Sequence, residues 1–174
     1  MRILVACEES QALTNRFREL GHEAFSCDIL PCSGGHPEWH LQHDVTKVLK
    51  LKWDMIIAFP PCTYLTNAGM CNLTRKGATD EYRANRLRLR DEAMEFAKMI
   101  YDNDCPLIAI ENPVGYLNTG WRKPDQIIKP YEYGQSVNKK TCLWLKGLPK
   151  LEPTNIVEPD NKRANLGKVV SSWY

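Results

Sequence analysis

The sequence predicts one α/β domain built around a doubly wound, mostly parallel sheet. Apolar runs of strand length alternate along the chain with segments of helical periodicity, which is typical of parallel strands joined by crossover helices. Such crossovers are right-handed in almost all known sheets, and this restricts the order in which the strands can lie. With 174 residues, the chain fits a single domain with a single core.

Each element follows from a local pattern. Ser10 is expected to cap the first helix and Gly21 to end it. Strands are expected at residues 3–6, 23–29, 54–59, 107–110 and 141–145, with a short, weak strand before Asp44. Helices are expected at residues 10–20 and 80–101, with a short helix from Thr46 and a loop over residues 31–39.

This order of elements is Rossmann-like and brings several polar residues to one edge of the sheet. These residues are Ser10, Asp28, Asp44, Cys62 and Glu111. We expect the domain to span residues 1–150, and the Pro-rich segment 151–174 to be an irregular C-terminal tail.

The composition narrows the class of protein. A hydrophobic content of 43% and a charged content of 25% are typical of a soluble globular protein, and no apolar stretch approaches the roughly 20 residues of a membrane span. Met1 leads directly into a strand pattern, so we expect no signal peptide. Seven cysteines without framework spacing favour reduced thiols in the cytoplasm. The net charge of +2 permits a nucleic-acid partner without requiring one.

The segment Phe59-Pro60-Pro61-Cys62 follows directly on a buried-strand pattern. Each proline fixes φ near −65° and removes an N–H, so the chain must leave the strand there as a stiff turn. A thiol on that turn is expected to point outward from the carboxyl edge of the sheet, as a candidate nucleophile. The alternative is a buried structural cysteine, because cysteine is among the most buried residue types.

A second strand end carries a candidate acid. The run at residues 107–110 ends in Glu111-Asn112-Pro113. A thiolate adds to an electron-poor conjugated carbon, and a neighbouring acid protonates the ring as it adds. A pyrimidine fits this pair, since sulfur attack at C6 with proton donation at N3 makes C5 nucleophilic. We therefore assign Cys62 and Glu111 as candidate catalytic residues, with Asn112 and the prolines orienting the loop.

These motifs resemble those of the cytosine-C5 DNA methyltransferases, and the chain looks most like a small, phage-type branch without the target recognition domain. Pro60-Pro61-Cys62 matches the family's Pro-Cys nucleophile motif, and Glu111-Asn112 matches its Glu-Asn-Val motif with Pro113 in place of valine. Gly115 matches a glycine that follows in the family. Segments 121–126 and 139–144 also resemble that branch, so the resemblance covers about residues 2–150.

The resemblance implies S-adenosylmethionine as cofactor and cytosine in DNA as substrate. Asp28 would hold the cofactor ribose and Asp44 its adenine, although both aspartates also suit caps and turns. The remaining cofactor-binding positions would be Ser10, Val45, Phe59 and Pro60. The substrate-binding positions would be Pro61, Lys139, Lys140 and Thr141, although a solvated face explains the lysine pair equally well.

The chain also departs from the family. Residues 6–11, Ala-Cys-Glu-Glu-Ser-Gln, replace the glycine-rich turn that contacts the methionine part of the cofactor, so we expect weak binding of S-adenosylmethionine. The helix after Ser10 would still attract the methionine carboxylate. The last two family motifs are absent before Tyr174, which fits either a short natural protein or a trimmed chain. A partner chain would then supply sequence specificity.

The sequence also allows other interpretations of its function. One alternative is an enzyme that modifies C5 of free pyrimidine nucleotides or uses another one-carbon donor. Another is an inactive module that binds nucleic acid. Basic residues after the cysteine loop suggest either a phosphate-contacting patch or a solvated helix face; they are Arg75, Lys76, Arg83, Arg86 and Arg90. A zinc site is not expected, because the spacing of its candidate ligands matches no metal motif; these are Cys32, His36, His40 and His43.

Overall fold

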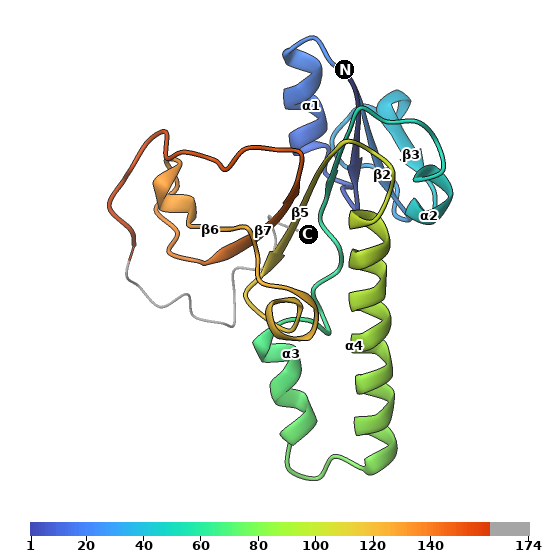
Figure 1. Cartoon of the computed structure of the whole chain (residues 1–174), viewed down its shortest axis with the longest axis vertical. Helices are drawn as coiled ribbons and strands as arrows, with labels where there is room; N and C mark the ends of the chain where they lie inside the picture. Colours follow the sequence, from blue (N-terminus) through green and yellow to red (C-terminus); the bar gives the residue numbers. More distant parts are fainter. Residues whose placement is uncertain (161–174) are drawn as a thin grey trace.

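The computed structural model describes residues 1–160 and contains one seven-stranded sheet with the order β3-β2-β1-β4-β5-β7-β6 (Figure 1). Its strands are β1 (Arg2–Ala6), β2 (Glu23–Asp28), β3 (His40–Gln42), β4 (Met55–Ala58), β5 (Leu107–Pro113), β6 (Gln126–Ile128) and β7 (Thr141–Lys146). Its α-helices are α1 (Ala12–Glu19), α2 (Val45–Val48), α3 (Asn67–Cys71) and α4 (Asp80–Tyr101). Single helical turns are η1 (Pro37–Trp39), η2 (Asn72–Thr74), η3 (Leu117–Trp121) and η4 (Pro130–Glu132).

Strands β1 to β5 form the parallel part of the sheet. From β1 the chain moves outward to β2 and β3, then returns to the other side of β1 for β4 and β5. The prediction of a doubly wound, Rossmann-like α/β fold is therefore confirmed. The point where the winding reverses lies between β1 and β4, and sheets of this kind bind ligands outside the carboxyl ends of their strands there.

The last two strands were not predicted to run antiparallel. β7 pairs antiparallel with both β5 and β6. Between β5 and β7 the chain contains only the short turns η3 and η4 and the strand β6, so no crossover helix carries the chain back to make a parallel pair. β6 was not predicted at all, because its three residues are too few to show an alternating pattern.

The sheet separates two apolar clusters. Along β1, Leu4 and Ala6 face one side and Ile3 and Val5 face the other, as strand alternation requires. The smaller cluster packs under α1, and the larger one lies under α2 and the C-terminal part of α4. At the C-terminal end of α4, Ala97 and Ile100 are fully buried.

The N-terminal half of α4 extends beyond the sheet. The helix has 22 residues, which corresponds to about 33 Å, and its only buried residues are Ala97 and Ile100 near its C-terminus. The first half of α4 instead lies against α3 and η2, and together they form a helical hairpin that projects past the carboxyl edge of the sheet (Figure 1).

The predicted tail is described only in part. Residues 151–160 contain no helix or named strand, and Val157 donates its backbone N–H to the carbonyl of Tyr131. Residues 161–174 lie outside the described residues. Within residues 1–160, none of the helices combines the length and apolar character needed to cross a membrane.

Candidate active site at the carboxyl edge of the sheet

Cys62 lies just beyond the end of β4, at the start of a tight turn. Its carbonyl oxygen accepts hydrogen bonds from the backbone N–H groups of Leu65 at 2.9 Å and Thr66 at 3.0 Å. Thr66 then caps α3 by accepting a hydrogen bond from Gly69 N. The predicted turn is present, and only 8% of Cys62 is exposed, so the residue is buried at the sheet edge as the alternative interpretation expected. The turn draws the chain back against the sheet edge before α3 begins.

Glu111 and Asn112 belong to β5, which is longer than predicted. Ile110 and Asn112 face the buried side of the strand, with 0% and 1% exposed, and Glu111 faces the opposite side. The side chain of Asn112 donates a hydrogen bond from Nδ2 to the Pro60 carbonyl at 2.8 Å. Asn112 therefore fastens the proline-cysteine loop of β4 to the neighbouring strand, which supports its predicted orienting role.

A second link joins the same two segments. The backbone N–H of Tyr116 donates to the Leu65 carbonyl at 2.6 Å, and Thr66 forms a bridge with Gly115. A Cβ at Gly115 would lie only 2.1 Å from the Leu65 carbonyl oxygen, so no larger residue fits there. The turns that follow Cys62 and Glu111 are thus held in contact through their backbones. The glycine was the signal for this contact in the sequence.

The electrostatics of Glu111 suit a proton donor. Burial raises the pKa of the Glu111 carboxyl above its ordinary value, and the nearby positive charge of Lys139 opposes this rise. A carboxyl with a raised pKa keeps its proton closer to neutral pH, which is the property a general acid needs. Lys139 acts on Glu111 and is therefore brought to the site. The structure shows no such effect of Lys140, which is exposed like its neighbour.

Two further predicted residues, Asp28 and Asp44, lie at the ends of β2 and β3, around the end of β1. Burial raises the pKa of the Cys7 thiol to about 12, and the carboxylates of Asp28 and Asp44 act in the same direction. Each aspartate also has a local role. Asp28 accepts a hydrogen bond from Leu30 N at 2.9 Å, and Asp44 accepts one from Thr46 N at 2.8 Å as the cap of α2.

The turn after β1 is filled by its own side chains. The Glu8 carboxylate accepts hydrogen bonds from Leu13 N at 2.6 Å, Thr14 N at 3.3 Å and Thr14 Oγ1 at 2.7 Å. The prediction that Ser10 caps this helix is wrong. Ser10 is exposed, Gln11 occupies the cap position, and the Glu8 carboxylate bonds the first free amides of α1.

Two residues of this turn take a conformation that normally favours glycine. Cys7 has φ 60° and Gln11 has φ 56°. Gln11 is fully buried and donates hydrogen bonds from Nε2 to the His36 carbonyl at 2.8 Å and to Ser26 Oγ at 3.2 Å. Its Oε1 accepts one from His36 N at 3.0 Å. These bonds compensate for the strain at Gln11 and fasten the loop after β2 across the turn.

That loop closes tightly on the turn. A Cβ at Gly34 would lie 2.3 Å from the Ser10 carbonyl oxygen, and Ser33 N donates to the Glu9 carbonyl at 2.9 Å. Sequence reasoning missed Glu8, Gln11 and Gly34 as the residues that build this region. An acidic residue ahead of a helix was the available signal for Glu8.

The fit to S-adenosylmethionine differs between the two ends of that molecule. Asp28 and Asp44 present carboxylates at the edge, as the nucleoside end requires. The amides of α1 that would receive the methionine carboxylate are already bonded to Glu8. The residues present therefore fit the nucleoside end and do not fit the amino-acid end at α1.

The other predicted positions are spread along the same edge. Val45 is buried at the start of α2, Phe59 packs on the smaller cluster, Pro60 is buried and Pro61 is exposed. Thr141 begins β7 and pairs with Pro113. Within residues 1–160 no three His, Cys, Asp or Glu side chains are placed to hold a metal ion. His36 stacks on Trp39, and His40 bonds Ser26 and Leu30.

Comparisons with known proteins bear on the fold. No protein-family model matches the chain, and no curated protein matches it. Among solved structures, the chain is similar to a candidate DNA modification methyltransferase encoded within a prophage of E. coli, with a TM-score of 0.53 and 15% identity. The likeness covers 90% of this chain and 51% of the other, so the chain spans about half the length of that structure. At this identity the likeness supports the Rossmann-type α/β fold.

Proposed function

We propose that this chain is a DNA methyltransferase-like enzyme that modifies C5 of cytosine through covalent attack by Cys62. The observation that carries the proposal is the hydrogen bond from Asn112 to the Pro60 carbonyl, because it fixes the loop of the nucleophile to the strand that bears Glu111. The raised pKa of Glu111 adds support, since the ring must receive a proton as sulfur adds.

Cys62 and Glu111 account for the covalent bond to the ring and for the proton at N3. The Cys62 thiolate forms a bond to C6, the electron pair of the C5–C6 double bond moves into the ring, and Glu111 gives its proton to N3. C5 is then nucleophilic and accepts a methyl group. Loss of the C5 proton to water restores the double bond, breaks the bond between sulfur and C6, and returns the N3 proton to Glu111. S-adenosylmethionine, when bound, supplies the methyl group.

DNA is the proposed substrate because the similar prophage protein is described as a DNA modification methyltransferase. A base inside a duplex has to leave the stack to reach Cys62, at a cost of a few kcal/mol. The mismatch between α1 and the amino-acid end of S-adenosylmethionine favours a second candidate, an enzyme that uses another one-carbon donor or a free pyrimidine nucleotide.

The test is covalent trapping on 5-fluorocytosine. Fluorine at C5 blocks the final elimination, so the wild-type chain should form an adduct that persists in denaturing gels and in mass spectra when the donor is present. Cys62→Ser should form none, because a hydroxyl is a far poorer nucleophile at neutral pH. Offering the base in a duplex and as a mononucleotide separates the two candidates. Absence of an adduct with either substrate, across donors that include S-adenosylmethionine, would contradict both.

A further inference from the structure

The helical hairpin of α3, η2 and the first half of α4 concentrates positive charge. Residues 64–90 contain six arginine or lysine side chains and two acidic ones, a net charge of +4. The whole chain carries +2, so the remainder carries −2. Because the hairpin projects past the carboxyl edge that holds Cys62 and Glu111, its charge lies on the side from which a substrate reaches the site (Figure 1).

Two of the basic residues are used to build the hairpin. Arg83 donates to the Leu73 carbonyl at 3.1 Å and pairs with Asp80 at 2.9 Å. Arg86 donates to the Gly69 carbonyl at 3.0 Å. These bonds join α4 to η2 and α3, so both arginines have an internal structural role.

Arg90 joins the base of the hairpin to the candidate site. Its guanidinium lies 3.9 Å from the centre of the Tyr116 ring and pairs with Asp91 at 2.7 Å. Tyr116 is also the residue whose N–H bonds the Leu65 carbonyl. The hairpin is therefore anchored on the segment that holds the nucleophile loop and the Glu111 turn together.

Arg75 and Lys76, at the tip of the hairpin, differ from these three. Both are exposed, and neither side chain makes an ion pair or hydrogen bond with any residue of the described part of the chain. Gly77 follows with φ 82°, a conformation that turns the loop sharply toward α4. The tip therefore presents two cations that have no structural use in the fold.

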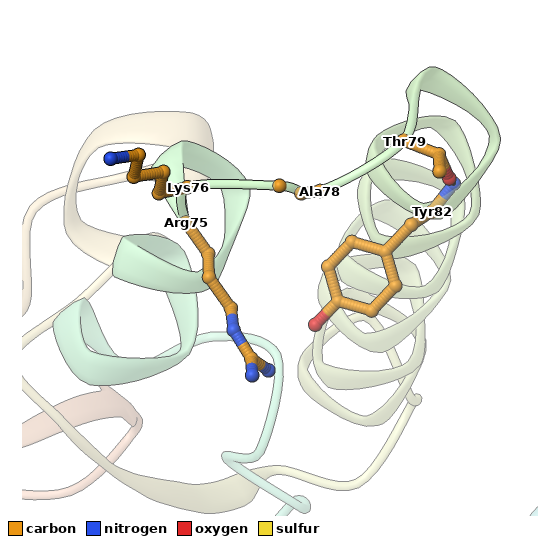
Figure 2. Close-up of a pocket in the computed structure, with 6 residues that line it drawn as sticks. Arg75, Lys76, Ala78, Thr79 and Tyr82 are labelled. Atoms are coloured by element: carbon orange, nitrogen blue, oxygen red, sulfur yellow. The ribbon is translucent and has the colours of Figure 1, made fainter.

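A cavity of about 310 Å³ lies beside these two cations. It is lined by residues 75–79 and by Tyr82. Figure 2 shows the Arg75 guanidinium and the Tyr82 hydroxyl extending toward the same space, while Lys76 extends to the other side of the loop. A guanidinium and a phenol together offer several N–H and O–H donors to one anion, and the lysine can meet a second anion nearby. Asp80, the nearest acid in sequence, pairs with Arg83 at 2.9 Å.

We propose that the hairpin tip, through Arg75, Lys76 and Tyr82, binds the phosphodiester backbone of DNA and holds the duplex beside the candidate site. The inference rests on the proposed function for its choice of DNA. Contacts of this kind position a duplex without reading its sequence. The tip thus supplies a contact to the DNA backbone from residues 75–82 alone.

The experiment measures binding of a fluorescent 20-base-pair duplex by anisotropy over a range of KCl concentrations, in a Cys62→Ser background that prevents chemistry. The slope of log K against log[KCl] is negative, and each lost phosphate contact should make it less steep by about 0.9. The double variant Arg75→Ala with Lys76→Ala should therefore reduce the magnitude of the slope by about 2. Affinity at low salt should fall about tenfold, and equally for unrelated sequences. Tyr82→Phe should weaken binding without changing the slope.

The matched control is Arg16→Ala with Lys98→Ala, which removes the same charge from exposed ion pairs away from the tip. It should leave the slope unchanged. An equal loss in the control, an unchanged slope in the tip variant, or no duplex binding by the parent chain would overturn the inference. Adduct formation on a 5-fluorocytosine duplex, measured with Cys62 restored at low KCl and a duplex concentration that saturates the tip variant, should reach the same extent in the tip variant as in the parent chain. At saturation that assay depends on Cys62, Glu111 and a donor, so its result reports on the proposed function separately.

Discussion

The carboxyl edge of the sheet contains two regions built in different ways. At the ends of β4 and β5, polar groups from one strand hold the loop of the next, and a carboxyl with a raised pKa stands beside them. At the end of β1, the polar side chains form hydrogen bonds within the protein. Glu8 accepts hydrogen bonds from the amides of α1, and Gln11 bonds the loop after β2.

The two regions differ in how they treat a carboxyl group. In the β4–β5 region, burial raises the pKa of the Glu111 carboxyl, and a perturbed pKa of this kind is typical of a reactive carboxyl. The β1 region satisfies a buried carboxylate with three donors, the condition in which a carboxylate stabilises a fold. Substitution of Glu111 should therefore reduce activity more than stability, and substitution of Glu8 should reduce stability more than activity.

The largest effect is expected at Glu111. Glu111→Gln removes the proton donor and should slow adduct formation on 5-fluorocytosine about 10² to 10⁴-fold.

The same substitution should change the pH dependence of stability. Burial raises the pKa of Glu111 in the folded protein, so the stability contributed by its protonated form is full below the unfolded pKa and is lost as pH rises through the folded pKa. Glu111→Gln should therefore unfold at a higher temperature than wild type at pH 7.5, with the gap closing at pH 4. A lower Tm at pH 7.5 would contradict this assignment.

The next effect is expected at Glu8. Glu8→Ala leaves Leu13 N, Thr14 N and the Thr14 hydroxyl without their acceptor and should lower the free energy of unfolding by about 2 kcal/mol. Urea unfolding followed by circular dichroism measures this loss, and Glu8→Gln, which keeps one acceptor oxygen, should lose less. Adduct formation by the folded fraction should stay within a few-fold of wild type. A loss of reactivity comparable to that of Glu111→Gln would erase the distinction between the two regions.

The smallest effect is expected at Lys139. Its charge lowers the pKa of Glu111, so Lys139→Ala should raise that pKa and move the alkaline limb of the pH–rate profile to higher pH. Lys140→Ala removes an equal charge one residue away and serves as the control, with no shift expected. A shift of the same size in both variants would show that Glu111 responds to overall charge rather than to Lys139.

The sequence predicted those parts of the structure that depend on local patterns. The bounds of α4 were predicted at residues 80–101 and confirmed, because a long stretch of helical periodicity is hard to mistake. The strands of the parallel part were recovered within one or two residues, apart from β5, which runs three residues further than predicted. The three-residue β6 was not predicted, and neither was the antiparallel direction of β7. The direction of a strand pair depends on the connections between strands, and these carry no local signal.

The parts of the candidate site that depend on local sequence patterns were also predicted. Proline and strand patterns placed Cys62 and Glu111 at one edge, and the parallel pairing of β4 with β5 confirms that both strands end there. The bond from Asn112 to Pro60 joins residues 52 apart in sequence, so no local pattern could reveal it. The cap on α1 was misassigned because Ser10 has the right residue type, whereas the conformation of Gln11 moves the start of the helix past it.

The glycine contact between Gly115 and Leu65 has a consequence for the proposed reaction on DNA. Because the backbones that follow Cys62 and Glu111 touch there, the proposed nucleophile and the proposed acid stand on segments that are joined when the chain folds. A pair held in this way has little reorganisation to undergo at the moment of reaction. The deformation needed to bring the two reactants together therefore falls on the nucleic acid, and damaged, mismatched or unpaired cytosines should be modified faster than paired ones.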